Sequence, residues 1–440
     1  VEIRSASGLH DVHAGDPLPD ALSGFLTATP FSYTTSVAPP MFAQGDRIGL
    51  SAIHRESYNF YFQDSWKLTP SVLLDYGLRY EVNSRIHEAA KRTSGAYPVK
   101  LDGRSSGARQ AFLVNPQPPY GMDWNGWAPR LALEWRPSGR TLFRAAGAIT
   151  ARLPNLFETN FLTGGTPFVV SPYITAAPGS PVHFENAVLQ FNLPPALAPD
   201  GTPVFPTGRS TDVAPNAEMD LERFERDLAA GTPGDQLHLL TVFGISPDFR
   251  NGYMANYTAG LERGLGDLDF GVSYVATIGV KLPAMAFPNS YGGAGPAFAP
   301  FTRFDDNGRV LGGFGPEYIM TSRSHSTYHA FQTGLQKTSP RAGLGFQINY
   351  TFSKSLDDTS AVLGGFLSAS SGAILQTFPQ NPRNTRAEKG PSTFDVTHVV
   401  AISLVQELPS AGGFWRPLTS GWQIFSLTTL ASGSPFWKQT

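Results

Sequence analysis

From Tyr58 to Glu81 the chain reads Y-N-F-Y-F-Q-D-S-W-K-L-T-P-S-V-L-L-D-Y-G-L-R-Y-E. In the second arm of this stretch one face carries only apolar or aromatic side chains, while the other carries Asp75, Arg79 and Glu81. This period of two is typical of a β-strand between unlike surroundings. Each arm has about ten residues, which matches the ~9 to 11 that cross a bilayer at a tilt rather than the ~5 to 6 of soluble strands. The stretch therefore predicts a membrane-spanning hairpin.

The orientation of this hairpin follows from its charges. Its turn, Leu68 to Ser71, is tight and contains a proline. If Asp75 and Arg79 faced lipid near the midplane, each would cost up to ~2 to 4 kcal/mol, so we expect the apolar face to point outward. Trp66 stands beside the turn and Tyr80 at the far end, where membrane proteins carry aromatic belts. A soluble hairpin with one buried face is the alternative.

The composition favours many strands and turns. Charged residues make up 15% of the 440, below the roughly 25% of soluble domains, and the chain has 45 glycines and 37 prolines. The net charge of -2 gives no basic surface for nucleic acid. The absence of cysteine excludes disulfides, thiolate metal sites and thiol catalysis. Length alone allows either two or three soluble domains or one very large barrel.

The two ends of the chain and its apolar runs carry further expectations. The chain starts Val1-Glu2-Ile3-Arg4, without an initiator Met or a signal peptide, which suggests a processed chain or a fragment. The nearest uncharged run, Thr359 to Gln376, is rich in Ser and Gly and too polar to span a membrane as a helix. Any spanning segments would have to be strands.

Four more hairpins follow the first, and together they predict ten strands. Residues 1–56 are irregular, with one or two possible strands, and residues 57–440 form the strand-rich part. Long polar segments separate the hairpins, so short and long connections alternate. This alternation is typical of bacterial barrels with short periplasmic turns and long extracellular loops. The expected short turns lie at residues 68–71, 137–139, 264–267, 338–343 and 409–420, and the long segments at 82–126, 153–252, 279–326 and 355–393.

Two local predictions are less regular. Within the second long segment, Pro215 to Ala230 predicts a short helix, with acidic residues in its first turns and Gly231 as its stop. Its face of Leu221, Phe224 and Leu228 is expected to pack on the loop. In the tenth strand, which begins at Trp422, Ile424 competes with Phe425 and Leu427, so the pattern leaves its two faces unassigned.

Several pieces of the chain, each weakly specific alone, occur in an order that resembles one family, the Oar-like TonB-dependent outer-membrane receptors. They cover Ser57 to Phe436. The pieces are F-Q-D-S-W-K-L-T-P and L-D-Y-G-L-R-Y-E within Phe62 to Glu81, W-A-P-R-L-A-L-E-W-R-P at Trp127 to Pro137, V-S-Y-V-A-T-I-G-V-K-L at Val272 to Leu282, Y-T-F-S-K-S-L-D-D at Tyr350 to Asp358, the stretch Arg383 to His398, and Gly421 to Phe436.

The resemblance implies an all-β fold: an antiparallel transmembrane β-barrel, of which this chain holds about ten of an expected 22 strands. The family's plug, its TonB-contacting segment and its last strands, which end in an aromatic residue, have no counterpart in this sequence. The expected place is the outer membrane of a Gram-negative bacterium, and the expected partners are outer-membrane lipid, TonB through that N-terminal region, and a ligand at the extracellular loops.

The function that the resemblance implies is import of an unidentified nutrient, such as a siderophore, a glycan or a peptide, and not an enzymatic reaction. The alternatives are a structural or adhesive outer-membrane barrel, or a porin without TonB energisation. A secreted soluble all-β protein that binds or hydrolyses glycans is a third class. No catalytic residue, cofactor or metal site is predicted, because the sequence lacks G-x-S-x-G, P-loop and G-x-G-x-x-G motifs and no carboxylate spacing selects an acid/base pair.

The remaining chemistry-bearing residues have simple explanations. His87 to Lys91 begins like H-E-x-x-H but has Lys at the second ligand position. Asp305 to Gly308 resembles the start of a calcium loop without its closing glutamate. The pairs His10 with His13 and His325 with His329 have metal-compatible spacing without carboxylate or Cys neighbours in sequence. The charged group Arg383, Arg386, Glu388 and Lys389 is expected at a solvated loop base or in lumen salt links. Four loop aromatics are candidate ligand contacts, none of them singled out: Trp124, Phe157, Phe161 and Tyr173.

Overall fold

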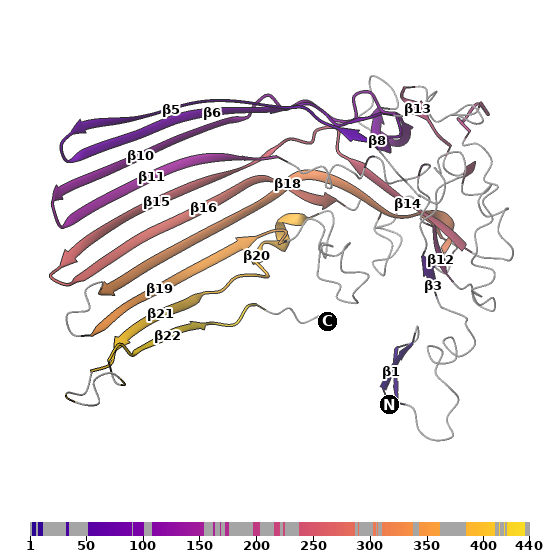
Figure 1. The fold of residues 1–440 in the computed structure, drawn as a ribbon. Helices are drawn as coiled ribbons and strands as arrows, with labels where there is room; N and C mark the ends of the chain where they lie inside the picture. The colour runs from indigo at the N-terminus through magenta and orange to yellow at the C-terminus, as the bar shows by residue number, and fades with distance from the viewer. Residues whose placement is uncertain are drawn as a thin grey trace.

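The computed structural model is an extended curved sheet with a looped region at one end (Figure 1). It describes residues 2–5, 8–11, 32–34, 52–89, 91–100, 108–153, 172–175, 197–202, 215–220, 223–224, 237–286, 302–304, 310–337, 343–360, 384–409 and 420–435, with single positions at 162, 168, 289, 306, 413 and 418. Among these segments no helix has the length and apolar character to cross a membrane.

Ten long strands form one antiparallel path in the order β22-β21-β19-β18-β16-β15-β11-β10-β6-β5. Chain neighbours are also spatial neighbours throughout, so the predicted five hairpins and ten strands are confirmed. We call this ten-stranded sheet the wall. Its strands are β5 (Ser57–Thr69), β6 (Val72–Asn83), β10 (Trp127–Ser138), β11 (Thr141–Arg152), β15 (Gly252–Leu265), β16 (Leu268–Ala286), β18 (Val310–Lys337), β19 (Leu344–Asp357), β21 (His398–Glu407) and β22 (Gln423–Ala431).

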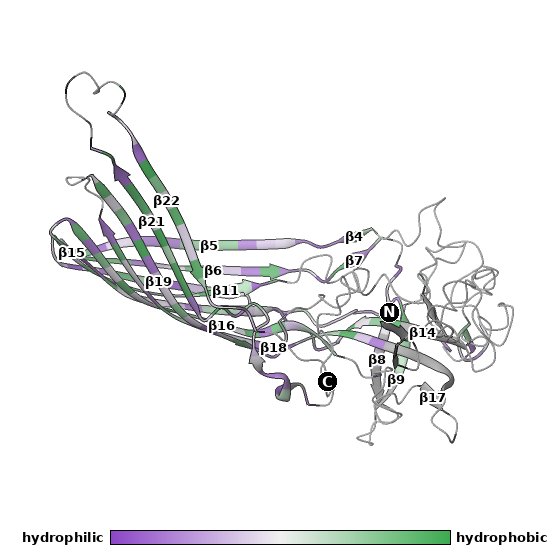
Figure 2. Cartoon of the chain, turned by 90° about the horizontal axis from the view of Figure 1, so that it is seen from below, coloured by the Kyte–Doolittle hydropathy of each residue, from purple (hydrophilic) through white to green (hydrophobic). Residues whose placement is uncertain are grey.

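The register extends the apolar face of the first hairpin across the wall. Residues directly opposite in an antiparallel pair share a face. The resulting apolar face joins side chains of seven strands, through the pairs Trp66 with Leu74, Leu74 with Leu133, Trp135 with Phe143, Tyr274 with Phe331 and Phe331 with Phe352. Its large members are exposed, as expected of a surface in contact with lipid. The colouring of Figure 2 shows the hydrophobic and hydrophilic residues alternating along the strands.

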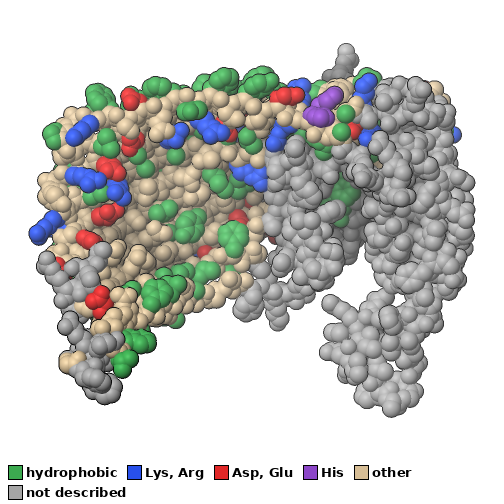
Figure 3. All heavy atoms as spheres, viewed as in Figure 1, with side chains coloured by type: hydrophobic (Ala, Val, Ile, Leu, Met, Phe, Trp, Pro, Cys, Tyr) green, Lys and Arg blue, Asp and Glu red, His purple; other side chains and the backbone are tan. Residues whose placement is uncertain are grey.

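The opposite face is polar over most of its width. Asp75 opposes Ala132, Glu134 opposes Arg144, and Ser273 opposes Gln332. Figure 3 views this face and shows charged side chains gathered toward the turn end of the wall. We call it the lumen face. The two faces confirm the predicted antiparallel membrane β-barrel class, with apolar residues outward.

Aromatic residues mark both levels of the apolar face. Near the loop end Tyr80 lies 4.4 Å from Trp127 between ring centroids. Near the turns Trp135 stacks on Phe143 at 5.1 Å. Two such levels match the aromatic belts at the two membrane interfaces.

Connections at the two ends of the wall differ in kind. At one end the β5–β6, β10–β11 and β15–β16 hairpins close in tight turns, such as the one at Gly266, whose φ of +68° lies in the left-handed region that favours glycine. At the other end strands β16 and β18 run on beyond the wall, to Ala286 and back to Val310. The prediction of a loop over the whole of 279–326 is therefore wrong at both margins.

Short strands form a second region at the loop end, which we call the cap. The sequence did not predict a hairpin in segment 82–126, a pair of strands in segment 153–252, or the parallel pairing of β14 (Leu237–Ile245) with β18. The short strands of the chain are β1 (Glu2–Ser5), β2 (Gly8–Asp11), β3 (Ser32–Thr34), β4 (Ile53–His54), β7 (His87–Glu88), β8 (Ser94–Lys100), β9 (Ala108–Val114), β12 (Pro172–Thr175), β13 (Ala217–Glu218), β14 (Leu237–Ile245), β17 (Thr302–Phe304) and β20 (Gly390–Pro391), and the 3₁₀ helix is η4 (Thr385–Glu388).

The helix predicted to start at Pro215 is wrong at its beginning. Asn216 adopts a φ of +55°, and β13 pairs with β9. The N–H of Met219 donates to the carbonyl of Phe112, so sheet bonding takes the backbone groups that a helix start needs. Arg223 and Phe224 are helical, and Phe224 is buried as expected of a packing face. Leu221 and Leu228 lie outside the described residues.

The cap has its own hydrophobic core, unlike the wall. Residues from six separate parts of the chain pack there, with Ile245, Leu162 and Met320 fully buried. The other members are Ile86, Tyr120, Phe243, Phe249 and Met285, with Ile53 and Tyr318 packed against them. Its members come from β14, β16 and β18, from the segments after β6, β9 and β14, and from position 162, so this core holds the loop end together.

The tenth strand has its faces set by its neighbour. Leu404 opposes Ser426 and Val405 opposes Phe425, so Phe425 and Leu427 lie on the lumen side. Both are strongly exposed. The contrast between a polar lumen face and an apolar outer face therefore ends before β22.

Candidate functional site

The lumen face carries a chain of charges near the turns. Arg144 Nε lies 3.4 Å from a Glu134 oxygen, and Arg144 Nη1 lies 3.1 Å from a Glu262 oxygen. These residues stand on β10, β11 and β15, near their turns. The register places Glu134 directly opposite Arg144, and Glu262 diagonal to Arg144, opposite Leu142. A second arginine, Arg136, reaches the other Glu134 oxygen at 3.4 Å. The chain of alternating charges ties three neighbouring strands together on the lumen side.

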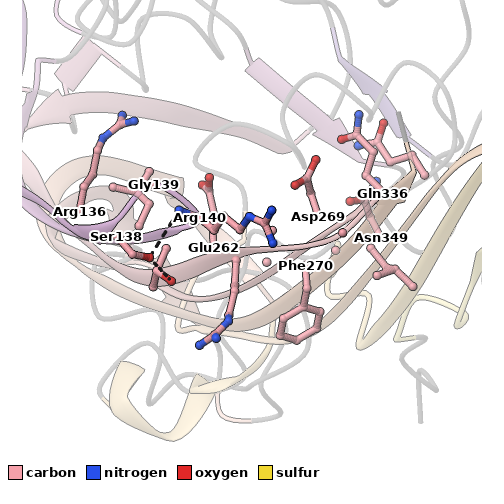
Figure 4. Close-up of a pocket in the computed structure, with 18 residues that line it drawn as sticks. Arg136, Ser138, Gly139, Arg140, Glu262, Asp269, Phe270, Gln336 and Asn349 are labelled. Atoms are coloured by element: carbon pink, nitrogen blue, oxygen red, sulfur yellow. Dashed lines mark hydrogen bonds between the residues drawn. The ribbon is translucent and has the colours of Figure 1, made fainter. Parts of the chain in front are cut away.

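A broad hollow of about 910 Å³ adjoins this chain of charges (Figure 4). Its lining is mostly polar and comes from six strands and their turns. Ser138 Oγ donates to Thr141 Oγ1 at 3.1 Å, and the N–H of Arg140 donates to Ser138 Oγ at 3.4 Å, which fixes one turn of the rim. The labelled lining residues in the close-up are Arg136, Ser138, Gly139, Arg140, Glu262, Asp269, Phe270, Gln336 and Asn349. This hollow can take hydrated or polar groups at the turn end of the lumen.

At the loop end, two of the motif stretches pack on each other. Lys354 Nζ donates to Asp395 Oδ2 at 2.6 Å, and the N–H of Ser355 donates to Asp395 Oδ1 at 2.7 Å. Ser355 Oγ bonds Ser392 Oγ at 2.8 Å, and β20 pairs with the end of β19. We call this group, Lys354, Ser355, Ser392 and Asp395, the clamp. It fastens the base of the loop before β21 to the wall.

The pKa of the clamp carboxylate, Asp395, is shifted from its ordinary value. Asp395 is 3% exposed, and this burial raises its pKa, but the hydrogen bonds from Lys354 and Ser355 and the charge of Lys354 lower it by more. The net pKa of Asp395 lies below its ordinary value, so the carboxylate stays charged at neutral pH. Sequence reasoning missed Asp395 because the clamp joins residues about 40 positions apart.

The candidate ligand aromatics have different outcomes. Trp124 lies in the segment between β9 and β10, is 63% exposed, and accepts a hydrogen bond from the Tyr80 hydroxyl on its carbonyl at 3.1 Å. Tyr173 lies in β12. Phe157 and Phe161 lie outside the described residues. Ligand contact by these four remains a prediction.

The histidine pairs do not combine into a metal site among the described residues. His325 and His329 lie four residues apart on one strand, a separation of about 13 Å along the backbone. His325 Nδ1 lies 3.7 Å from Asp358, a carboxylate neighbour that the sequence spacing did not reveal. His329 Nδ1 bonds the Tyr274 hydroxyl at 2.6 Å. Over the described part of the chain no group of three or more His, Asp or Glu side chains is placed to hold a metal ion.

The other charged motifs lie at the loop end. His87 and Glu88 form β7, and buried Glu88 accepts hydrogen bonds from the N–H groups of Ala52 and Arg92, so its carboxylate has a structural use. Asp306 lies in a turn after β17. Arg386 and Lys389 are exposed, at η4 and just after it, and Glu388 is half-buried. His13, Arg383 and Asp305 lie outside the described residues, and His10 lies in β2.

Solved structures of three transport proteins align with the chain at low identity. The copper transporter OprC is 10% identical, with a TM-score of 0.36 over 86% of this chain and 35% of that protein. The siderophore receptor PirA from Acinetobacter baumannii is 9% identical, with a TM-score of 0.34 over 86% and 38%. The ferric enterobactin receptor PfeA from Pseudomonas aeruginosa is 11% identical, with a TM-score of 0.34 over 86% and 37%. The chain thus spans less than half the length of each.

No curated protein matches the chain. A model of the family described as the outer membrane beta barrel domain matches residues 6–440. This match covers the wall and the cap together, and the two faces of the wall have the sidedness that such a barrel requires. The chain therefore belongs to the outer membrane beta barrel domain family, and its place is the outer membrane of a Gram-negative bacterium.

Proposed function

We propose that the chain forms part of the barrel of a TonB-dependent receptor, which binds a scarce solute outside the cell and imports it with energy relayed from the inner membrane. The observation that carries the proposal is the folded cap over the loop end of the wall. A passive porin needs an open mouth, whereas a receptor needs a structured surface that grips a ligand. The ordered motifs from Ser57 to Phe436 also support it, because they resemble the Oar-like group of such receptors.

The open edges of the wall support a larger barrel. Within the described residues, β5 and β22 each have one strand neighbour on the main path. At an unpaired strand edge in hydrocarbon, each unsatisfied backbone N–H or C=O group costs roughly several kcal/mol. Both edges therefore need further strands to pair with. We propose a barrel of about 22 strands, of which residues 57–440 supply ten. Residues 1–56 precede the wall, and their strands β3 and β4 pair with β12 and β7. TonB would act through a region that precedes these residues in the full protein.

The test is uptake with and without TonB. Cells that express the full-length gene are supplied with a panel of labelled iron chelates, oligosaccharides and peptides, and accumulation is compared between a strain with TonB and one without it. We expect at least one class to accumulate only with TonB. Accumulation that is equal in both strains would make the protein a passive porin, and binding without accumulation would make it an adhesive or structural barrel.

A further inference from the structure

The lumen-side row of β6 continues past the end of the wall into the cap. Arg79 pairs with Glu81, and the next two residues of the same row are Asn83 and Arg85. Asn83 is 8% exposed, and both atoms of its side-chain amide are buried without a hydrogen-bond partner among the described residues. The Nε atom of Arg85 is also buried without a hydrogen-bond partner among the described residues. A buried polar group without a partner is unfavourable, so three such atoms in one place indicate that something else bonds to them.

Two cavities meet at Arg85. A small one, of about 20 Å³, lies against Asn83 and Arg85, with walls from Tyr120 to Asp123 and from Phe249 and Asn251. Its volume has room for about one oxygen-sized group. A larger one, of about 340 Å³, lies on the other side. Both are lined by Ser84, Arg85 and Met122, so Arg85 stands between a narrow pocket and a wider cleft. The cleft is large enough for a small organic solute.

The walls of the pocket are held by backbone bonds. The N–H of Ile86 donates to the Tyr120 hydroxyl at 3.0 Å, and the N–H of Gly121 donates to the carbonyl of Pro247 at 2.9 Å. The ring of Tyr120 meets Phe249 edge-on at 6.1 Å. These contacts hold together the segments that form the walls around Asn83 and Arg85, so the pocket is formed before a ligand binds.

The charge around the two cavities favours an anion. Burial raises the pKa of the Tyr120 phenol, and the nearby guanidinium groups of Arg55 and Arg85 act in the opposite direction, which places both positive charges close to the pocket. Lys91 and His87 line the cleft. Two carboxylates also line the cavities, and both have partners. Asp123 accepts from the N–H groups of Asn251 and Asn125, at 2.9 and 3.0 Å. Glu88 accepts from the N–H groups of Ala52 and Arg92 and lies 3.6 Å from the Arg92 guanidinium. The site therefore offers donors and positive charge.

We propose that Asn83 and Arg85 form a subsite for the oxyanion of a hydroxylated solute, a carboxylate or phosphate group beside a hydroxyl. A guanidinium group binds such oxyanions through charge-assisted hydrogen bonds. The amide nitrogen of Asn83 donates a further bond, and the amide oxygen accepts one from the neighbouring hydroxyl. The rest of the solute lies in the 340 Å³ cleft. This inference rests on the proposed import function and assigns its substrate to the class of sugar acids and sugar phosphates.

The test uses the full-length protein, purified from outer membranes in detergent, with four probes: galacturonate, galactose, glucose 6-phosphate and inorganic phosphate. Binding is measured by calorimetry for the wild type, Arg85→Gln, Asn83→Ala and the control Arg323→Gln. Arg323 is exposed at the loop end of β18 and lines neither cavity. We expect a hydroxylated oxyanion to bind more tightly than galactose or phosphate, and each site variant to weaken it about tenfold or more, with the control unchanged.

Several results would overturn the subsite. They are no binding of galacturonate and glucose 6-phosphate to the wild type, equal binding of galactose, or unchanged binding in the variant that assembles. Heat-modifiable migration on gels shows which of the two site variants, Arg85→Gln and Asn83→Ala, assemble. Binding measured on one assembled site variant is sufficient for the test. TonB dependence is scored separately: import that needs TonB without oxyanion binding contradicts the subsite alone, while oxyanion binding with equal accumulation in both strains contradicts the proposed function alone.

Discussion

Asp395 shows what one buried carboxylate does in this protein. It accepts hydrogen bonds from a lysine of β19 and from a backbone N–H of the same strand, and so connects the loop before β21 to the wall. The two donors lie on successive residues, so the carboxylate bridges side chain and backbone at one point. Loss of the carboxylate charge would leave both donors with a weaker partner.

We predict that Asp395→Asn weakens the loop base by about 1 to 3 kcal/mol, because a charge-assisted bond is replaced by a neutral one at a buried position. Faster proteolytic cleavage between η4 and β21 in purified outer membranes measures the loss. Asp306→Asn is the control, since Asp306 is exposed in a turn outside the clamp. Equal cleavage rates in the two variants would contradict a structural role for Asp395.

The same residue predicts an acid dependence. The pKa of Asp395 is lower in the folded protein than the ~3.9 of an unfolded aspartate. Its contribution to stability is therefore complete above about pH 5 and is lost as the pH falls through the folded value. Melting midpoints of the wild type should fall more steeply than those of Asp395→Asn below about pH 4. Parallel curves would show that Asp395 does not titrate on unfolding.

At the scale of the strand, neighbouring positions of β10 have opposite surroundings. Leu133 lies on the outward apolar face and Ala132 on the lumen face, opposite Asp75. An arginine at position 133 would face lipid, at a cost of ~2 to 4 kcal/mol near the midplane. An arginine at position 132 would face the water of the lumen and the carboxylate of Asp75.

We therefore predict that Leu133→Arg reduces the amount of heat-modifiable protein in the outer membrane and that Ala132→Arg does not. Immunoblots of boiled and unboiled membranes measure the assembled fraction. The two variants place the same residue, arginine, at adjacent positions of one strand. The added charge and the strand propensity of the new residue are therefore the same in both. An equal loss in both variants would contradict the assignment of the two faces.

The turns offer a backbone test without side-chain contacts. A Cβ at Gly266 or at Gly139 would meet nothing within 4 Å, but only Gly266 has a positive φ, +68°. Gly266→Ala should destabilise the protein by about 1 to 2 kcal/mol through left-handed strain, and Gly139→Ala by less than ~1 kcal/mol. Melting midpoints in detergent compare them. A larger loss for Gly139→Ala would mean that the turn conformations are assigned to the wrong hairpins.

How much of this structure the sequence predicts depends on the distance over which each feature is encoded. The strands are local: alternation such as Leu131, Leu133 and Trp135 specifies both the strand and its outward face. The pairing of Glu134 with Arg144 was also predictable in principle, because residues at equal distance from one turn come into register, and Glu262 lies diagonal to Arg144 on the next strand. The signal was present and required only counting from the turns.

The cap was not predictable in the same way. Its core joins Leu162, Ile245 and Met320, which lie far apart in sequence and have no shared period. The β13 segment shows the reason, since hydrogen bonds to β9 replaced a helix that local signals favoured. The pocket at Asn83 likewise depends on segments that meet only after folding.

For the whole molecule, wall and cap have different sources of stability. The wall is held by its hydrogen-bonded ladder and exposes its large apolar side chains, as a lipid-facing surface does. The cap buries its apolar side chains in a packed core. Removing buried methyl groups from that core costs about 2 to 5 kcal/mol, while trimming an outward side chain in lipid leaves no comparable void.

This division predicts that Ile245→Ala loosens the cap and leaves the wall assembled. Ile245 is fully buried in the cap, whereas Ile348 lies on the outward face of β19 and is the matched control. Proteases added to intact cells should cleave the Ile245→Ala cap faster than the wild-type cap, with the heat-modifiable band retained, and Ile348→Ala should resemble the wild type. Loss of the band in Ile245→Ala would show instead that cap and wall fold as one cooperative unit, so that the loop-end core is a condition for insertion.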